Sequence, residues 1–274
     1  SRGFRFSEEY DGWWMTTRYK ALLHYAAANF VPPGSRIVTG IPLHIFGSQR
    51  AQHQISDVFR KALKAPAVAV LPQGFGALCL AISTNSALAQ GRVALVDIGS
   101  RTTELICFSD GQYLNHESAG VVLGVGQVYT QVAQKLSSQH QRQIDAYEVD
   151  WALREDKPIK IKGGVVERQA LETLVQHYVR PLATRLHNEM TRLWKEGAPG
   201  IDHLLYCGGG SALLASHLGH FRDDYTILPE SQFTNAAGYL EYIRLTSTDQ
   251  TRAQDQGAED TSQGDTSAQK ASHA

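Results

Sequence analysis

Several classes of protein are excluded by what the sequence has little of. It contains only three cysteines, Cys79, Cys107 and Cys207, each within an apolar run, and their separations fit no zinc-binding pattern. We therefore expect reduced core thiols in a cytosolic protein. No uninterrupted apolar stretch reaches the ~20 residues that span a bilayer, and the N-terminus lacks the charged-then-apolar pattern of a signal peptide. The sequence thus predicts neither a membrane-spanning nor a secreted protein.

Net charge is also nearly absent, at −1 over 274 residues. Such a chain has no overall field that attracts DNA, RNA or a membrane surface, so we expect no direct nucleic-acid or membrane partner. Lys157, Lys160 and Lys162 form a local basic stripe, which we interpret as the exposed face of a strand. His217 and His220 lie three residues apart on a predicted helix, but no third ligand lies nearby in the sequence to complete a metal site.

What is present is enough apolar sequence for a substantial core. With 42% apolar residues, the chain can form two small domains or one large one. Strand-length and helix-length patterns alternate up to residue 90, which predicts the α/β class. The longest helical pattern covers Val165–Glu196, where Pro181 is expected to kink the helix or divide it in two. Thr246–Ala274 has almost no large apolar residues and is expected to be disordered.

The chain is organised around residues 92–126. Arg92–Asp97 is an apolar run of strand length that ends in a carboxylate, and Glu104–Phe108 is a second such run. The polar turn between them predicts a strand, a turn and a returning strand. Asp110-Gly111 predicts a second hairpin, with Gln112–Ser118 returning as a third strand. An ordinary meander with an aspartate in its turn is the other interpretation of these residues.

The first of these turns has the composition of an anion-binding loop. Gly99 allows a positive φ and a close approach to a ligand, so the amides of Gly99, Ser100 and Arg101 can converge on a phosphate. Asp97 would lie beside them, where a carboxylate near a polyphosphate acts through a bridging divalent cation such as Mg²⁺ with its waters. The turn therefore predicts a phosphate and magnesium site.

The sequence Asp97-Ile98-Gly99-Ser100-Arg101-Thr102-Thr103-Glu104 resembles the second phosphate loop of the ATPase superfamily that includes actin, the heat-shock chaperones and the sugar kinases. With the later Gly120…Gly124-Val125-Gly126 run, it is most similar to the plasmid-segregation actin-like ATPases of the ParM/StbA type. The resemblance implies an α/β, actin-like (ribonuclease H-like) ATPase fold with mixed sheets flanked by helices. It also implies ATP and Mg²⁺ as ligands, with a catalytic Asp97 holding Mg²⁺ through water and the phosphates bound by Gly99, Ser100, Arg101, Thr102 and Thr103.

Pro72-Gln73-Gly74-Phe75-Gly76-Ala77 lies at a predicted strand-to-helix junction. In the resembled family the matching segment crosses between the two domains and carries a Glu or Gln that orients the water attacking the γ-phosphate. The resemblance assigns this catalytic role to Gln73, whose neutral amide can position water although it cannot take a proton. The alternative is a capped helix start in which Gly74 and Gly76 are turn residues.

Three glycines, Gly208, Gly209 and Gly210, follow a predicted buried strand, His203–Cys207, and precede a helix. They remove side chains where the backbone must approach a ligand, and a helix N-terminus adds a partial positive charge. The resemblance implies that these glycines, with Ser211, form the adenosine wall of a nucleotide pocket. A plain glycine-rich loop is the alternative.

Phe233-Thr234-Asn235-Ala236-Ala237-Gly238-Tyr239 resembles the second connector between the domains of the plasmid-segregation actins. There, small residues let the last helix pack closely while the domains shear. The alternative is a crowded helix face without motion. Connector, phosphate loop, adenosine glycines and second connector occur in the order of the family, and this order favours the resemblance.

The resemblance also implies a domain organisation. Residues 1–90 would be the remainder of domain I, 91–230 domain II with a helical subdomain inserted at about 127–197, 231–245 a helix returning to domain I, and 246–274 a disordered tail. Family members normally open with a first phosphate loop containing Asp-x-Gly, and no such stretch precedes Trp13. We therefore expect an N-terminally incomplete fold, as a fragment or as a degenerate member. ATP hydrolysis is expected only if the full-length protein supplies the first loop.

The function implied by the resemblance is polymerisation with ATP into filaments that segregate plasmid DNA in the bacterial cytoplasm, with ATP hydrolysis driving filament turnover. The expected partners are further copies of the chain and an adaptor protein bound to centromere-like plasmid DNA. Two rival functions stay open. One is a small-molecule kinase or phosphatase of the same fold, and the other is a non-hydrolysing actin-like scaffold.

Overall fold

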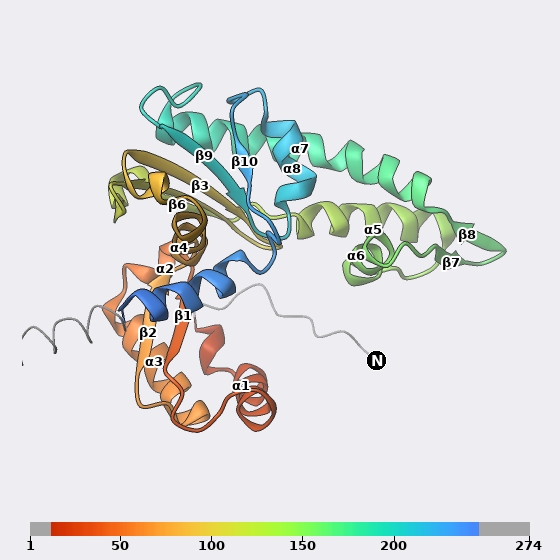
Figure 1. Ribbon diagram of the computed structural model, residues 1–274. Coiled ribbons are helices and arrows are strands. Elements are labelled where there is room, and N and C mark those ends of the chain that lie inside the picture. The colour runs from red at the N-terminus through yellow and green to blue at the C-terminus, as the bar shows by residue number, and fades with distance from the viewer. Residues whose placement is uncertain (1–11, 247–274) are drawn as a thin grey trace, which may run out of the picture.

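The computed structural model describes residues 12–246, which are built around a six-stranded mixed sheet (Figure 1). Its strands are β3 (Arg92–Ile98), β4 (Thr103–Ser109), β5 (Gln112–Tyr113), β6 (Ala119–Val121), β9 (His203–Cys207) and β10 (Thr226–Ile227). Their order is β10-β9-β3-β4-β5, and β6 also pairs with β4. The central strand, β3, runs parallel to β9 and antiparallel to β4. The expected disordered tail lies outside the described residues from 247 onward.

The side chains of β3 alternate between two cores. Val93 and Leu95 belong to the core that includes α4 (Phe75–Thr84). Ala94, Val96 and Ile98 belong to the larger core that includes α5 (Gly126–His140), α7 (Arg168–Trp194) and α8 (Ser211–Leu218). None of the five is more than 1% exposed. Because both faces of the sheet are covered, β3 reads in the sequence as a continuous apolar run.

The N-terminal part has a small sheet and a core of its own. Its elements are η1 (Trp13–Met15), α1 (Thr17–Asn29), β1 (Ile37–Ile41), α2 (Leu43–Phe46), α3 (Gln49–Leu63) and β2 (Val68–Pro72). β1 and β2 pair in parallel. α3 begins at the N-cap Ser48, whose side chain accepts a hydrogen bond from Ala51 N–H, and it buries Ile55 and Phe59. This part lies below the main sheet in Figure 1.

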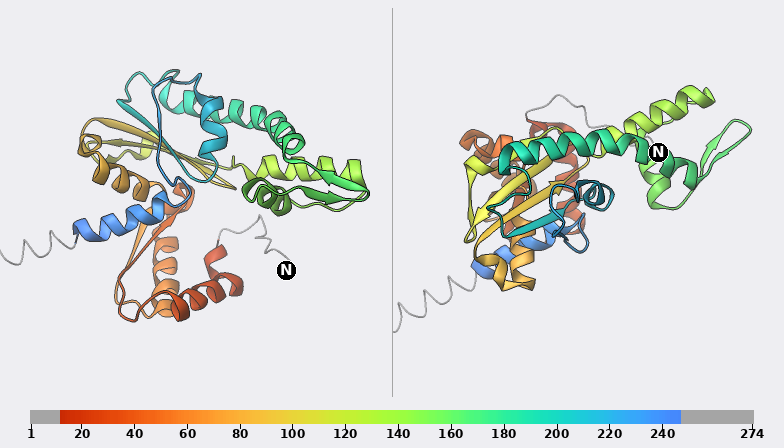
Figure 2. Two further views of the ribbon diagram at one scale, coloured as in Figure 1. Left: turned by 45° about the vertical axis from the view of Figure 1, so that its right-hand side comes forward. Right: turned by 90° about the horizontal axis from the view of Figure 1, so that it is seen from above.

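A helical arm extends away from the main sheet, as both views of Figure 2 show. It comprises α5, α6 (Ala146–Arg154), the hairpin of β7 (Ile159–Ile161) and β8 (Gly164–Val166), and α7. The sequence patterns missed β8. Pro181 does not divide α7, which is one helix of 27 residues. Pro181 is exposed, so the carbonyl that loses its hydrogen-bond partner can face water.

The segment expected to return as one strand, Gln112–Ser118, is interrupted. Only its first two residues form β5, and the turn η3 (Asn115–Glu117) follows before β6. The Ser118 hydroxyl donates a hydrogen bond to Leu114 O (2.7 Å) and accepts one from Cys107 N–H (3.0 Å). A side chain therefore bonds backbone groups that a continuous strand would have paired in a ladder.

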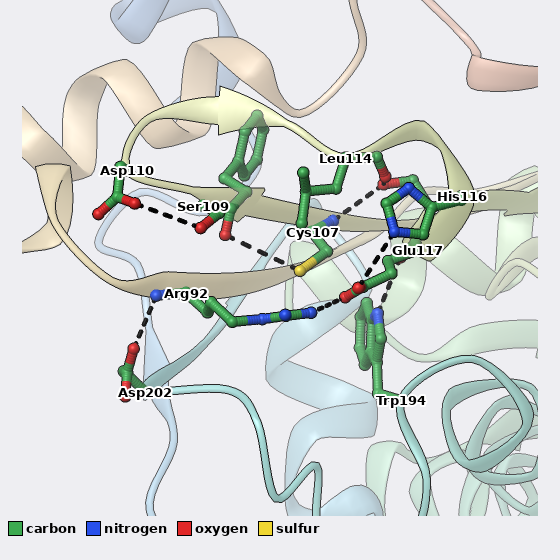
Figure 3. Close-up of polar contacts among 11 residues, drawn as sticks. Arg92, Cys107, Ser109, Asp110, Leu114, His116, Glu117, Trp194 and Asp202 are labelled. Atoms are coloured by element: carbon green, nitrogen blue, oxygen red, sulfur yellow. Dashed lines mark hydrogen bonds and ion pairs between the residues drawn. The ribbon is translucent and has the colours of Figure 1, made fainter.

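Figure 3 shows the polar cluster at the start of β3, at the opposite end of the strand from Asp97. The Arg92 guanidinium pairs with the Glu117 carboxylate, and this hydrogen bond lowers the pKa of Glu117. Trp194 Nε1–H donates to Glu117 O at 2.9 Å, which ties α7 to the turn. Burial raises the pKa of the neighbouring Cys107 thiol to about 11, so it stays protonated near neutral pH. All three cysteines are buried and free, as expected.

Residues 234–246 form a helix that crosses α4 between the N-terminal part and the main sheet (Figure 1). The two helices touch through glycines. A Cβ atom on Gly238 would lie 1.6 Å from Gly76 O, and one on Gly76 would lie 2.3 Å from Asn235 O. No side chain fits at such distances, so the small residues of the second predicted connector are required by close packing.

This contact predicts the effect of Gly238→Ala. The added methyl must push the helices apart, so we expect the free energy of unfolding in urea to fall by about 2 kcal/mol or more. Gly47→Ala is the matched control, because Gly47 has a φ of −62° and open space around its Cβ position. It should change stability by less than about 0.5 kcal/mol. Equal effects of the two substitutions would contradict the close crossing.

Candidate functional site

Asp97 lies one residue before the end of β3, where two predicted motifs meet. In the sheet it is paired with Cys207 of β9 and with Glu104 of β4. Because β3 and β9 are parallel, the turn after Asp97 and the glycines after Cys207 leave the same edge of the sheet. Gly210 N–H donates a hydrogen bond to Ile98 O at 2.9 Å. The structure therefore brings the predicted phosphate turn and the predicted adenosine glycines into contact.

The contact between these two loops depends on Gly208. It has a φ of +84°, which favours glycine. A Cβ atom there would lie 2.4 Å from Ile98 O and 2.5 Å from Asp97 Oδ1. Gly209, in contrast, is exposed, and the nearest atom to a Cβ there would be Gln232 Cγ at 3.7 Å. Gly208 thus permits the close approach, and Gly209 faces outward beside it.

The turn itself differs from the expectation for Gly99. Its φ is not positive, and its N–H donates to Thr102 O at 2.9 Å, so this amide closes the turn and does not point at an anion. Gly99 O and Ser100 O accept hydrogen bonds from the amides of residues 125 (3.1 Å) and 126 (2.8 Å). Ser100 and Arg101 are exposed at the tip. These two residues therefore form the solvent-facing part of the turn.

The run of small residues after the second hairpin supports the turn from behind. A Cβ atom on Gly124 would lie 2.4 Å from Ser100 O, and one on Gly126 would lie 2.7 Å from it. The buried Thr103 hydroxyl donates to Leu123 O at 2.5 Å. Thr103 therefore holds the turn in place from the protein interior and does not face solvent, whereas Thr102 is half-buried.

The Asp97 carboxylate is 4% exposed. Burial raises its pKa, and hydrogen bonds from Asn235 and Cys207 oppose that rise. Asn235 Nδ2 donates to Asp97 Oδ2 at 2.7 Å. A carboxylate buried in this way keeps its charge only with donors or a cation close to it.

Glu104 is a second buried carboxyl group beside Asp97, and the sequence analysis gave it no role. It is 1% exposed, and its Oε2 accepts a hydrogen bond from Leu43 N–H, at the start of α2, at 3.1 Å. Burial raises its pKa to about 7, the Leu43 hydrogen bond opposes this, and the charge of Asp97 adds to it. In the sequence, only the expected hairpin, which pairs position 104 with position 97, could have indicated that Glu104 lies beside Asp97.

Gln73 follows directly after β2, and its N–H donates to Ile41 O at 2.8 Å. Its side chain is half-buried. Asn235, which the sequence analysis placed only in a connector, joins this segment to the site, because its Oδ1 accepts from Gly74 N–H at 3.0 Å. The first connector and Asp97 thus share one side-chain partner.

Ser211 begins α8, directly after the glycines. Its side chain is fully buried, and within residues 12–246 its hydroxyl has no hydrogen-bond partner. A helix N-terminus can bind an anion such as a phosphate, and a carboxylate beside it can bind Mg²⁺ through water. The residues at this edge of the sheet therefore fit the nucleotide and Mg²⁺ that the resemblance implies.

Other parts of the described chain show weaker candidates for a ligand site. Two surface hollows of about 380 and 350 Å³ are lined by none of the predicted site residues. Within 12–246, no three His, Cys, Asp or Glu side chains gather to hold a metal ion. His217 Nε2 is hydrogen-bonded to Gln176 Oε1 at 2.8 Å. No helix in that range is both long and apolar enough to cross a bilayer.

The raised pKa of Glu104 predicts a pH-dependent effect of Glu104→Gln. The folded-state pKa, about 7, exceeds the ordinary value of 4.5, so the stability contributed by protonated Glu104 is full below pH 4.5 and lost as the pH rises through 7. Glutamine keeps an acceptor for Leu43 N–H and never ionises. We expect the free energy of unfolding in urea to be higher for the variant than for the wild type at pH 8, by up to about 3 kcal/mol. At pH 5 the two should differ by less than about 1 kcal/mol.

The control for that measurement is Glu189→Gln, which removes a carboxylate from a surface pair with Arg192. Its effect should be small and nearly the same at both pH values. A pH-independent effect of Glu104→Gln would show that the carboxyl group is not destabilised by burial.

A family model described as the C-terminal domain of archaeal MreB-like actin homologues matches residues 95–220. No curated protein sequence matches the chain. Among solved structures, the pCBH ParM non-polymerisable quadruple mutant is 22% identical over 85% of this chain and 76% of that chain, with a TM-score of 0.70.

Two further solved structures are similar to the chain. A 15-stranded ParM filament from Clostridium botulinum is 20% identical over 86% of this chain and 75% of that chain, with a TM-score of 0.69. The archaeal actin homologue Ta0583 in complex with ADP is 20% identical over 84% and 78%, with a TM-score of 0.66. The chain therefore has the actin-like fold, of the kind found in ParM and in archaeal actin homologues, as its phosphate-loop motif predicts.

Proposed function

We propose that the chain binds ATP with Mg²⁺ at the edge of the main sheet and polymerises into filaments. The observation that carries the proposal is the contact between the turn after Asp97 and the loop at Gly208. Two similar proteins support it, because Ta0583 was solved in complex with ADP and the Clostridium botulinum ParM was solved as a filament.

Each site residue has a stated part in this proposal. Asp97 holds Mg²⁺ through water, and the phosphates lie at the turn formed by Gly99, Ser100, Arg101, Thr102 and Thr103. Gly208, Gly209, Gly210 and Ser211 form one wall of the adenosine pocket. Gln73 orients the attacking water from the end of β2. Bound Mg²⁺ supplies the charge that lets polyphosphate approach a buried carboxylate.

The proposal also assigns the two parts of the molecule to domains. Residues 1–90 and 231–245 belong to one domain, and 91–230 to the other, with the arm at about 127–197 inserted in the second. The nucleotide would bias the angle between the domains and so the surface that meets the next copy. A ligand shifts such an equilibrium only by binding one state more tightly.

The cellular role we propose is plasmid segregation in the bacterial cytoplasm. Filaments would grow with ATP, turn over with ATP hydrolysis, and reach plasmid DNA through an adaptor protein bound to centromere-like sequences. Direct contact with nucleic acid is not part of the proposal, since the chain carries a net charge of only −1.

Asp97→Asn tests the nucleotide site. Calorimetry with Mg·ATP should show binding to the wild type and about tenfold weaker binding to the variant, since the amide cannot balance the charge of hydrated Mg²⁺. Asp57→Asn on α3 is the control, because it removes a carboxylate that is exposed and far from β3 in the sequence. The absence of Mg·ATP binding to the wild type would refute the proposed site.

Light scattering tests the filament. The signal should rise when Mg·ATP is added to the wild type, and it should rise less or decay sooner with Mg·ADP. If nucleotide binds without any change in scattering, a small-molecule kinase or phosphatase of the same fold becomes the better explanation.

A further inference from the structure

The side chain of Asn235 contacts three segments that are far apart in the sequence. Its Oδ1 accepts hydrogen bonds from Gly74 N–H (3.0 Å) and Ala77 N–H (3.1 Å) at the start of α4. Its Nδ2 donates to Asp97 Oδ2 at 2.7 Å, across 138 positions of the chain. Both partners of Oδ1 are obligatory donors, so the amide can be oriented in only one way, with its NH₂ group toward the carboxylate.

The backbone at Asn235 is fixed by the helix crossing. Asn235 lies in the first turn of the helix at 234–246, and a Cβ on Gly76 would lie 2.3 Å from its carbonyl oxygen. One turn later, Gly238 packs against Gly76 O. A shift of this helix over α4 would therefore move the Asn235 carboxamide and the hydrogen bond that it gives to Asp97.

Capping of α4 does not by itself explain an asparagine at this position. A carboxylate caps a helix N-terminus about as well as an amide does, and it also interacts favourably with the helix dipole. Only the amide has a donor to spare for Asp97, whose other side-chain donor is the Cys207 thiol. The residue type is thus explained by the link to Asp97 together with the cap.

We propose that Asn235 is a positioning residue, which sets the orientation of the Asp97 carboxylate according to the crossing of α4 and the helix at 234–246. This inference rests on the proposed function, because it gives Asp97 its task of holding hydrated Mg²⁺. It adds a physical link between the angle of the two parts of the molecule and the binding of the metal. That link is the side chain of Asn235.

Asn235→Asp tests the proposal, because it keeps the acceptor for Gly74 and Ala77 and replaces only the donor to Asp97. With ADP as the probe, we expect the affinity measured with Mg²⁺ to fall about tenfold, and the affinity measured in EDTA to change less than twofold. A merely structural role would weaken both affinities alike. Equal loss with and without Mg²⁺, or no loss, would overturn the proposal.

A stability measurement tests the same hydrogen bond without nucleotide. Asn235→Asp places two carboxylates together and should lower the melting temperature, whereas the double variant Asp97→Asn/Asn235→Asp exchanges amide and carboxylate and should regain most of that loss. If the melting temperature of the double variant is lowered by the sum of the two single decreases or by more, the inference is overturned. If Asn235→Asp alone fails to fold, a double variant that also fails to fold would overturn the inference.

Asn29→Asp is the matched control. It makes the same chemical change at an exposed position, where Asn29 Nδ2 donates to Tyr25 O at 2.8 Å. We expect unchanged ADP affinity with and without Mg²⁺. If wild-type protein binds no ADP, the proposed function fails, and the stability cycle still decides whether Asn235 positions Asp97. If wild-type protein binds Mg·ADP and Asn235→Asp binds it equally well, only the further inference fails.

Discussion

Hydrogen bonding of β3 along both of its edges is the constraint on which the candidate site depends. The parallel neighbour, β9, ends level with Asp97, so the glycines that follow it leave the sheet beside the turn that follows Asp97. The antiparallel neighbour, β4, returns from that turn and places Glu104 opposite Asp97. Two motifs separated by about a hundred residues in the chain are neighbours in space because of one strand's register.

That arrangement buries two carboxyl groups side by side, which is costly unless their charge is offset. The structure offsets part of it with donors from other elements: the Asn235 amide and the Cys207 thiol for Asp97, and the Leu43 N–H for Glu104. Two of these three donors lie outside the main sheet. The stability of the two buried carboxyl groups at the sheet edge therefore depends on where the surrounding helices lie.

The sequence allowed the fold to be predicted, and it also marked the two loops that meet at the edge of the main sheet. β9 occupies His203–Cys207 as predicted, because an apolar run ended by glycine is a strong local signal. α2 has only four residues, which are too few to show a helical period in the sequence. The positive φ expected at Gly99 occurs at Gly208. Which glycine takes it depends on how two loops meet, and no local pattern encodes that.

The residues that sequence reasoning missed share a property. Glu104 and Leu43 are 61 positions apart, and Asn235 and Asp97 are 138 apart. Contacts of this kind depend on the packing of whole elements, and a single sequence carries no trace of them. The residue types were visible, but their partners were not.

The arm is formed by one uninterrupted stretch of chain, and this has a consequence for how such a protein can change over time. α5 starts beside the turn, where Gly126 N–H bonds to Ser100 O, and α7 ends at Trp194, which bonds to Glu117 O. Both ends of the insertion are therefore anchored on the sheet, whereas its outer hairpin lies at the far end of the arm (Figure 1). Lineages can lengthen, shorten or replace that outer portion and leave the strand register untouched. The tip of the arm is the place where diversification between relatives should be least constrained.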